Sequence, residues 1–396
     1  MTRTVGVVAR GVRTPIIKQG DDLAGIIVDS LCHSMEVEKF CLNDKDVLGM
    51  TESLLARAQG NYATIEHITE AINKRFKSDN IAVLFPILSR NRFSLLLKSI
   101  ALTDKKIFLF LSYPSDEMGN CLMDRNMMYE LDINPYIDNF NETEYRKIFG
   151  NTYLHPFTAV DYVKLYKDLA VNDNIRIYFT NNPILALDYS KEILVANIHD
   201  RQRTKDIVRK AGAQTVYGLD DILNESIDGS GFNPEYGLLG SNKATETSVK
   251  LFPRDCYKFV KKVQGLIKER TGKLIEVMIY GDGAFKDPQG NIWELADPVV
   301  SPGFTDGLRG MPNEVKLKYI ADNELKDFNN IDVVKEMIRK LKDSDYNKNG
   351  ERESIGTTPR QITDLLGSLF DLVSGSGDKG TPIVLVQGYF DNYASE

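Results

Sequence analysis

The sequence predicts an α/β protein of two domains, one of which contains a mainly parallel sheet. Its 396 residues exceed the usual length of a single domain. Its composition, 42% hydrophobic and 27% charged residues, is typical of a globular protein. Between residues 78 and 226, strand-type apolar runs alternate with stretches of helical periodicity. This alternation is typical of a parallel sheet covered by helices, so we expect the block to fold as a compact domain of its own.

The residues before this block predict strands at 5–9 and 47–51 and helices that begin at Leu23 and span 65–76. The first helix is supported by apolar residues at helical spacing and by Asp21 or Asp22, either of which can cap it. The loop before it contains Pro15 and Gly20. Such a loop can hold an anion at a helix N-terminus, but an ordinary strand-to-helix turn has the same features and is more common.

Within the block, the expected strands are 81–85, 106–112, 175–180, 193–198 and 215–218, and the expected helices are 93–100, 160–170 and 204–211. None of these strands is followed by G-x-G-x-x-G, which disfavours a dinucleotide role. A linker rich in Gly, Ser and Asn at 224–232 closes the block.

After the block, helices are expected at 254–270, 331–341 and 361–373, and strands at 275–280 and 382–386. The strand at 275–280 is followed by a run of acids, namely Asp282, Asp287, Glu294, Asp297 and Asp306. Clustered carboxylates suit Mg²⁺ or Mn²⁺ that carries a phosphate. A solvated acidic loop after a core strand remains an equal alternative.

Charge and residue spacing exclude several classes of function. A net charge of −7 without a basic block argues against nucleic acid or an anionic membrane as the main partner. The longest apolar runs are too short to span a bilayer, and the four scattered cysteines read as reduced thiols of a cytoplasmic protein. The four histidines form no metal or triad pattern. Residues 345–350 resemble half of a calcium loop, but Gly356 stands where a bidentate Glu is needed.

The loop at 375–380 is rich in glycine, so its backbone N–H groups can cradle a phosphate, with Lys379 as the counter-charge. It is not a Walker A motif, because it follows a helix and lacks G-K-[ST]. Alone, such a loop is more often a flexible turn.

Five segments in chain order carry a resemblance to a known family: Thr14-Pro-Ile-Ile-Lys-Gln-Gly, the stretch from Asp46 to Gly60, Gly237-Leu-Leu-Gly-Ser-Asn242, the run from Leu251-Phe-Pro-Arg-Asp to Asp282, and the stretch from Val373 to Gly388. Together they resemble the coenzyme F420-0:γ-glutamyl ligase family. The resemblance covers residues 5–62 and 237–390, which a much shorter stretch joins in the family. It therefore implies a ligase-like domain made of 1–77 and 227–396, with 78–226 inserted as an α/β domain.

The resemblance implies an enzyme that uses GTP and a divalent metal, Mg²⁺ or Mn²⁺, to join glutamate to a carboxylate acceptor through an acyl phosphate. It also implies an intertwined homodimer. The alternative is a nucleotide- or metabolite-binding protein on the same fold that has lost catalysis. A third, weaker hypothesis places the function in the inserted domain.

Carried over by position, the resemblance implies that Thr14, Pro15, Ile16, Ile17, Glu52, Ser53, Arg57 and Asn242 contact the nucleotide. It implies that Gly375, Ser376, Gly377, Asp378, Lys379 and Gly380 hold phosphates and that Asp282 binds the metal. The sequence departs from the family at Leu239, Gly283 and Ser376, where the family has metal ligands, and at Arg57, where it has lysine. Glu235, Asp287 or Asp378 are candidates to replace the missing ligands.

Overall fold

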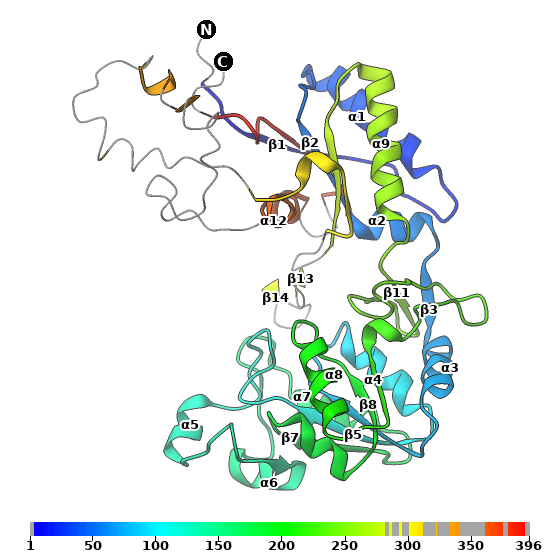
Figure 1. Ribbon diagram of the computed structural model, residues 1–396, viewed down its shortest axis with the longest axis vertical. Coiled ribbons are helices and arrows are strands. Elements are labelled where there is room, and N and C mark those ends of the chain that lie inside the picture. The colour runs from blue at the N-terminus through cyan, green and yellow to red at the C-terminus, as the bar shows by residue number, and fades with distance from the viewer. Residues whose placement is uncertain are drawn as a thin grey trace.

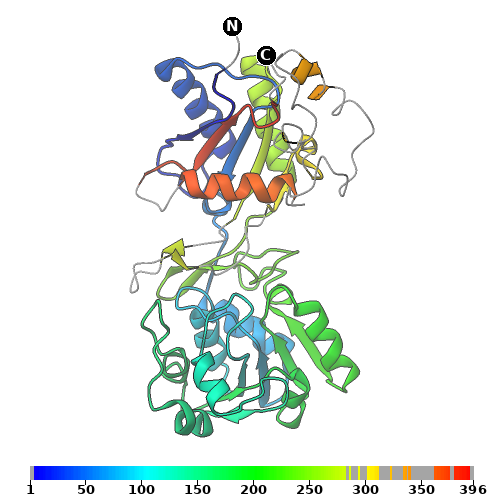
Figure 2. The same cartoon turned by 90° about the vertical axis from the view of Figure 1, so that its left-hand side faces the viewer.

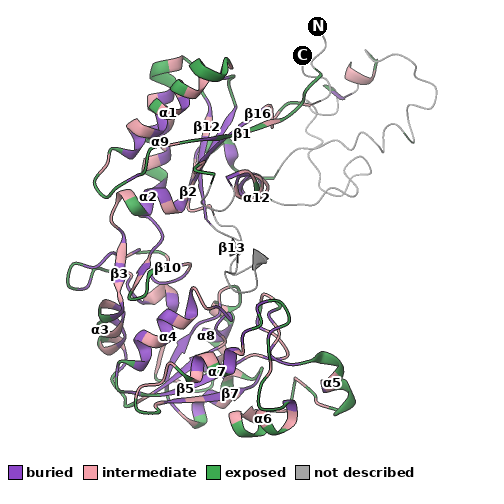
Figure 3. Ribbon diagram, turned by 180° about the vertical axis from the view of Figure 1, so that it is seen from behind, coloured by how far each residue is buried: buried purple, intermediate pink, exposed green. Residues whose placement is uncertain are grey.

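The computed structural model describes residues 4–281, 285–286, 293–294, 301–311, 322, 333–336, 338–339, 361–374 and 379–392. Two large sheets, one of five and one of six strands, organise the described chain, and a small sheet of three strands lies between them (Figure 1). Buried residues concentrate in the strands of the two large sheets and in the helix faces that cover them (Figure 3). The predicted α/β class is confirmed.

The five-stranded sheet has the order β1 (Val8–Val12), β16 (Ile383–Gln387), β2 (Val47–Thr51), β12 (Glu276–Tyr280) and β15 (Gly303–Phe304). One face packs on α1 (Leu23–Glu38) and α9 (Cys256–Thr271), and the other face packs on α12 (Ile362–Ser374), as Figure 2 shows. Alternate residues of β2 serve the two faces: Leu48 and Met50 point to α1 and α9, whereas Val47 points to α12. A strand that is buried on both faces reads as a continuous apolar run, which is why the sequence predicted β2 correctly.

The six-stranded sheet has the order β6 (Phe140–Asn141), β7 (Ile175–Phe179), β5 (Lys106–Leu111), β4 (Asn80–Leu84), β8 (Glu192–Val195) and β9 (Thr215–Gly218). All its pairings are parallel except the one between β6 and β7. The chain adds β5 and β7 on one side of β4, then returns to add β8 and β9 on the other. The order therefore reverses between β4 and β8, which is the topological switch point of a doubly wound sheet.

Helices cover both faces of this sheet. The core on one face includes residues of α3 (Ile65–Arg75), α4 (Phe93–Ala101) and α7 (Tyr162–Lys167). The other face packs on η1 (Pro183–Asp188) and α8 (Arg201–Lys210). Two short helices, α5 (Arg125–Glu130) and α6 (Glu142–Phe149), fill the connection between β5 and β7. The predicted helix-covered parallel sheet is thus confirmed.

The three-stranded sheet, in the order β10 (Asn242–Thr245), β11 (Ser248–Lys250) and β3 (Tyr62–Thr64), lies where the chain passes twice between the large sheets. The side chain of Gln59 exchanges hydrogen bonds of 2.7 and 2.8 Å with the backbone of Arg254. The buried Asn61 Nδ2 donates to the Phe252 carbonyl at 2.6 Å. The core of the six-stranded sheet also takes in Ala63 and Leu251. The chain therefore passes between the two large sheets near residues 61 and 252, and the division into 1–77 with 227–396 and 78–226 stays a prediction.

Most elements begin or end within three residues of their predicted bounds, and the exceptions have physical causes. The first strand starts at Val8 rather than Val5, because its pairing with β16 begins at the Val8–Gln387 pair. Of the helix predicted at 331–341, the described residues 333–336 and 338–339 are helical, and the others lie outside the described part of the chain. The described chain also contains a two-stranded hairpin, β13 (Phe285–Lys286) and β14 (Trp293–Glu294).

Gly49, in the centre of β2, faces α12 with no room for a side chain. A Cβ there would lie 2.3 Å from the ring of Phe370, which is itself fully buried. Gly49→Ala should therefore lower the free energy of unfolding by about 1 to 3 kcal/mol through overpacking. Gly265→Ala on α9 is the matched control: nothing lies within 4 Å of its Cβ, and alanine favours the helix by about 1 kcal/mol. Urea unfolding measures both, and equal midpoints for Gly49→Ala and wild type would contradict the packing argument.

Candidate active site

Four segments meet at one edge of the five-stranded sheet. Strand β16 runs antiparallel to both β1 and β2, and β12 runs parallel to β2. The carboxyl ends of β1, β2 and β12 and the amino end of β16 therefore share one edge. The register fixes their neighbours: Ile383 pairs with both Val12 and Met50, and Thr51 pairs with Tyr280.

This edge gathers the positions that the resemblance singled out. Residues 14–17 follow β1, Glu52 and Ser53 follow β2, and Gly281 follows β12. Lys379 and Gly380 precede β16, and the Pro382 carbonyl accepts a hydrogen bond of 3.1 Å from the Thr51 N–H. Segments that are hundreds of residues apart in the sequence thus lie side by side at the carboxyl edge, where open α/β sheets bind their ligands.

Lys250 joins two of the predicted nucleotide contacts. Its Nζ donates to Ser53 Oγ and lies 3.9 Å from Glu52 Oε1, and Glu52 is only 2% exposed. Across the β10–β11 pair, Lys250 is the direct partner of Asn242. One half-buried cation therefore contacts Ser53, lies near Glu52 and pairs across the strands with Asn242. The sequence analysis missed Lys250, because a single lysine in a three-residue strand carries no pattern.

The loop at 14–20 closes against the end of α2 (Glu52–Ala58). The Gly20 N–H donates to the Ala58 carbonyl at 2.9 Å, and the Gln19 side chain lies so close to Gly60 that a Cβ there would be 2.3 Å away. Within the loop, Ile17 is buried in the core, Thr14 is half-buried, and Pro15 and Ile16 are exposed. Arg57, in the last turn of α2, is exposed.

The neighbourhood of Glu52 is electronegative. Burial raises the pKa of the Cys256 thiol to about 12, with further contributions from the charges of Glu52, Glu235 and Asp255. Burial and the charge of Glu235 likewise raise the pKa of Tyr236 to about 12. Cys256 therefore stays protonated at neutral pH and is not an available nucleophile. The carboxylates and Lys250 are among the charged groups that the described part of this edge offers to a ligand.

Several predicted positions lie outside the described residues: Asp282, Asp287, Gly283, Gly375, Ser376, Gly377 and Asp378. Lys379 and Gly380 are described and are exposed. Asp306, from the acidic run, is already bound to Lys261 Nζ at 2.7 Å and to Arg309 Nε at 3.2 Å. Within the described ranges, no group of three or more His, Cys, Asp and Glu side chains is placed to hold a metal. In the same ranges, no helix is long and apolar enough to cross a membrane.

Leu239, at the position of a family metal ligand, lies away from this edge. It is buried in the core of the six-stranded sheet and, with Phe93, Leu96 and Leu219, lines a cavity of about 30 Å³, room for about one water molecule. An aliphatic side chain has no atom that can coordinate a cation, so Leu239 cannot act as the metal ligand that the resemblance places at this position.

Comparison with known proteins agrees with the geometry of the edge. No curated protein matches the sequence. The family model for F420-0:gamma-glutamyl ligase matches residues 11–388, a range that includes all four edge segments and the six-stranded sheet. The chain belongs to the F420-0:gamma-glutamyl ligase family, whose activity is of the γ-glutamyl ligase type.

Proposed function

We propose that this chain uses GTP and Mg²⁺ or Mn²⁺ to join glutamate to a carboxylate acceptor, at the carboxyl edge of the five-stranded sheet. The observation that supports this most is the meeting of residues 14–17, Glu52–Ser53, Gly281 and Lys379–Gly380 at that edge. These are the segments that, by resemblance to the family, are expected to contact the nucleotide and the metal.

The proposed reaction has two steps. An oxygen of the acceptor carboxylate attacks the γ-phosphorus of GTP, the bond from that phosphorus to the β–γ bridging oxygen breaks, and GDP leaves. The amine of glutamate then attacks the acyl carbon of the acyl phosphate, phosphate leaves with the bonding electrons, and the amine loses a proton. Both steps depend on positioning and charge neutralisation.

Some residues of this edge can supply the positioning and the charge neutralisation that both steps need. Lys250 Nζ, beside Ser53 Oγ, places a positive charge where a phosphate can bind, and Asn242 lies directly across from it. We propose that the N–H groups of Gly375, Gly377 and Gly380 add donors to the phosphates, with Lys379 beside them. Glu52 is a hard oxygen donor, and Asp282 is the next residue after Gly281. A bound metal would neutralise phosphate charge there.

A binding protein without catalysis is the second candidate, and the position of Leu239 favours it. A buried leucine stands where the family has a metal ligand, and a reaction that uses two metal ions needs that ligand. Two measurements in sequence separate the two functions. GTP binding by calorimetry, followed by phosphate release with F420-0 and L-glutamate in Mg²⁺ or Mn²⁺, indicates the ligase. Binding without release indicates the binding protein, and absence of binding contradicts both.

Lys250→Met should lower kcat for metal-dependent GTP turnover by about 100-fold, because it removes a preorganised charge beside the transferring phosphoryl group. The matched control is Lys258→Met on α9, an exposed lysine whose Nζ lies 2.9 Å from Asp255. It should leave turnover unchanged. Steady-state phosphate release measures both variants, with circular dichroism to confirm folding. Turnover within twofold of wild type in folded Lys250→Met would remove Lys250 from the site.

We also propose a homodimer that works in the cytoplasm. Strand β1 forms an edge of its sheet, and Val5 and Val7 beside it are 56% and 51% exposed. Exposed apolar side chains next to an edge strand suit contact with a second copy. Cys32, Cys41, Cys121 and Cys256 are all free thiols, which suits a reducing compartment. Light scattering that gives a monomer at micromolar concentration would contradict the dimer.

A further inference from the structure

The six-stranded sheet has a polar pocket of its own, which the ligase reaction does not use. The pocket measures about 270 Å³ and lies at the carboxyl edge of the parallel strands. Phe85 follows β4, Ser112 follows β5, Asn181 follows β7 and Asn197 follows β8, and all four line it. Strands β4 and β8 are the pair between which the strand order reverses. Open α/β sheets bind small ligands at this point.

On the β5 side, the pocket is lined by two carboxylates. Asp116 is buried, and its carboxylate accepts hydrogen bonds from the Leu88 N–H at 2.8 Å, from the Met118 and Asn120 N–H groups at 2.9 Å and from Asn120 Nδ2 at 2.8 Å, which fix its orientation. Glu117 accepts hydrogen bonds from the Ile198 and His199 N–H groups at 2.5 and 2.9 Å, so the loop after β5 is bound to the loop after β8. These acids make this side of the pocket attractive to a cation.

On the β8 side, the pocket is lined by the start of α8. Asp200, the residue before the helix, makes no capping hydrogen bond with its side chain, so the first N–H groups of the helix are left to another acceptor. Arg203 lies in the same turn, with its side chain 75% exposed and 3.8 Å from Asp200. A helix N-terminus with an adjacent guanidinium attracts an anionic group.

Asn197 supplies an independent sign of a ligand. It is 5% exposed and lines the pocket. Its Nδ2 donates to Thr204 Oγ1 at 3.2 Å, but its Oδ1 has no hydrogen-bond partner among the described residues. A buried amide oxygen without a donor costs about 1 to 3 kcal/mol. A ligand N–H group would satisfy it.

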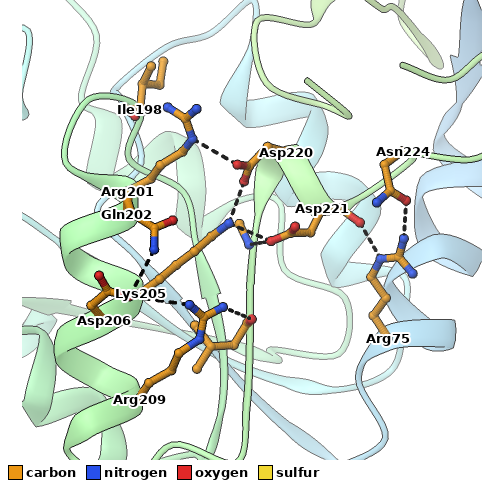
Figure 4. A network of polar contacts seen from close by, with 12 residues as sticks. Arg75, Ile198, Arg201, Gln202, Lys205, Asp206, Arg209, Asp220, Asp221 and Asn224 are labelled. Atoms are coloured by element: carbon orange, nitrogen blue, oxygen red, sulfur yellow. Dashed lines mark hydrogen bonds and ion pairs between the residues drawn. The ribbon is translucent and has the colours of Figure 1, made fainter. Parts of the chain in front are cut away.

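The start of α8 is held rigidly, as a preformed site requires. Figure 4 shows the network: Lys205 bridges Asp220 and Asp221 at 2.9 and 2.7 Å, and Arg201 bonds to Asp220 at 3.0 Å and to the Ile198 carbonyl at 2.6 Å. The network ties the first turns of α8 to Asp220 and Asp221, which lie after β9, and to the loop after β8.

We propose that this pocket binds a small α-amino acid. Its carboxylate would meet the N-terminus of α8 and Arg203, and its ammonium group would meet Asn197 Oδ1 and the carboxylates of Asp116 and Glu117. The volume suits a small metabolite, since drug-sized ligands occupy about 300 to 1,000 Å³. A nucleotide is disfavoured, because Asp116 and Glu117 would face its phosphates. The proposal holds whether or not the chain is an active ligase.

The experiment measures binding to the full-length protein by calorimetry, with the proteinogenic amino acids as probes one at a time. Glutarate, which lacks the amine, putrescine, which lacks the carboxylate, and myo-inositol, which has neither charge, are the comparison ligands. We expect one or a few amino acids to bind and the three comparison ligands not to bind. Binding of a comparison ligand in preference to every amino acid, or no binding by any probe, would overturn the proposal.

Variants separate this pocket from the edge of the five-stranded sheet. Arg203→Ala should weaken amino-acid binding by about tenfold, whereas Arg209→Ala, an exposed arginine further along α8, should not change it. Ser112→Leu fills the pocket and should abolish binding. Lys250→Met should leave it intact, because Lys250 lies in the three-stranded sheet beside Glu52 and Ser53 and does not line this pocket. If Arg203→Ala and Ser112→Leu both fold and bind like wild type, the amino acid binds elsewhere and the proposal fails.

Discussion

Lys205→Met should lower the free energy of unfolding by about 3 kcal/mol. The Lys205 side chain is only 5% exposed, and its Nζ contacts Asp220 Oδ1 at 2.9 Å and Asp221 Oδ2 at 2.7 Å (Figure 4). Removal of one partner of a buried ion pair costs about 3 to 5 kcal/mol, because the remaining charge stays buried and unpaired. The lower end applies, since Asp221 is 35% exposed and water partly screens it.

The loss should depend on pH in a defined direction. Burial alone would raise the pKa of Asp220, but hydrogen bonds and charge from Lys205 and Arg201 hold it below its usual 3.8. The stability that Asp220 contributes is therefore present above pH 3.8 and is lost as the pH falls through the lower pKa of the folded protein. The difference between wild type and Lys205→Met should be full at neutral pH and should shrink below about pH 4.

Urea unfolding at pH 7 and at pH 3.5 measures this difference. Lys210→Met, at an exposed position of the same helix, is the control and should change stability by about 0.5 kcal/mol or less. A loss of equal size at both pH values would mean that Lys205 stabilises α8 through the packing of its methylene groups, not through its charge.

The strands were predictable from sequence because most are apolar on both faces, but the polar start of α8 was not. The predicted helix began at Thr204, while α8 begins at Arg201. Its first turn is Arg-Gln-Arg, which has no apolar periodicity, and the helix is held there by the carboxylates of η2 (Leu219–Asp221), which no local pattern reveals. The position of α8 is therefore set by tertiary contacts and not by a pattern in its own sequence.

Tertiary contacts that no local pattern reveals also limit what the sequence predicts of the two sites, the edge of the five-stranded sheet and the pocket of the six-stranded sheet. Family resemblance named the segments at the edge of the five-stranded sheet, but only the register of β1, β16, β2 and β12 brings them together. No pattern in the sequence pointed to Lys250. The pocket of the six-stranded sheet had one: Ser112 and Asn197 lie in the last residues of the strands predicted at 106–112 and 193–198, and Asn181 directly follows the strand predicted at 175–180. Polar residues at the carboxyl ends of adjacent parallel strands predict a site, once the strand order is known.

Asp282→Asn should abolish metal-dependent GTP binding while leaving thermal stability nearly unchanged. Asp282 itself lies outside the described residues. Gly281, directly before it, follows β12, and the register that pairs Tyr280 with Thr51 brings the chain at that point beside Glu52. Asparagine keeps the shape of the side chain but removes the charge that Mg²⁺ or Mn²⁺ prefers. Calorimetry with GTP in Mg²⁺, in Mn²⁺ and in EDTA measures the binding.

Asp306→Asn is the matched control, because the Asp306 carboxylate is already engaged by Lys261 and Arg309 and is not free for a cation. It should bind GTP like wild type. Unchanged binding in Asp282→Asn would show that Asp282 is not a metal ligand. A second outcome is possible: wild type binds no GTP, and Asp282→Asn melts at a higher temperature than wild type. The Asp282 carboxylate would then lower the stability of the protein without binding a ligand, as charged residues at a former binding site often do. That result would favour a chain that keeps the family fold and has lost the reaction.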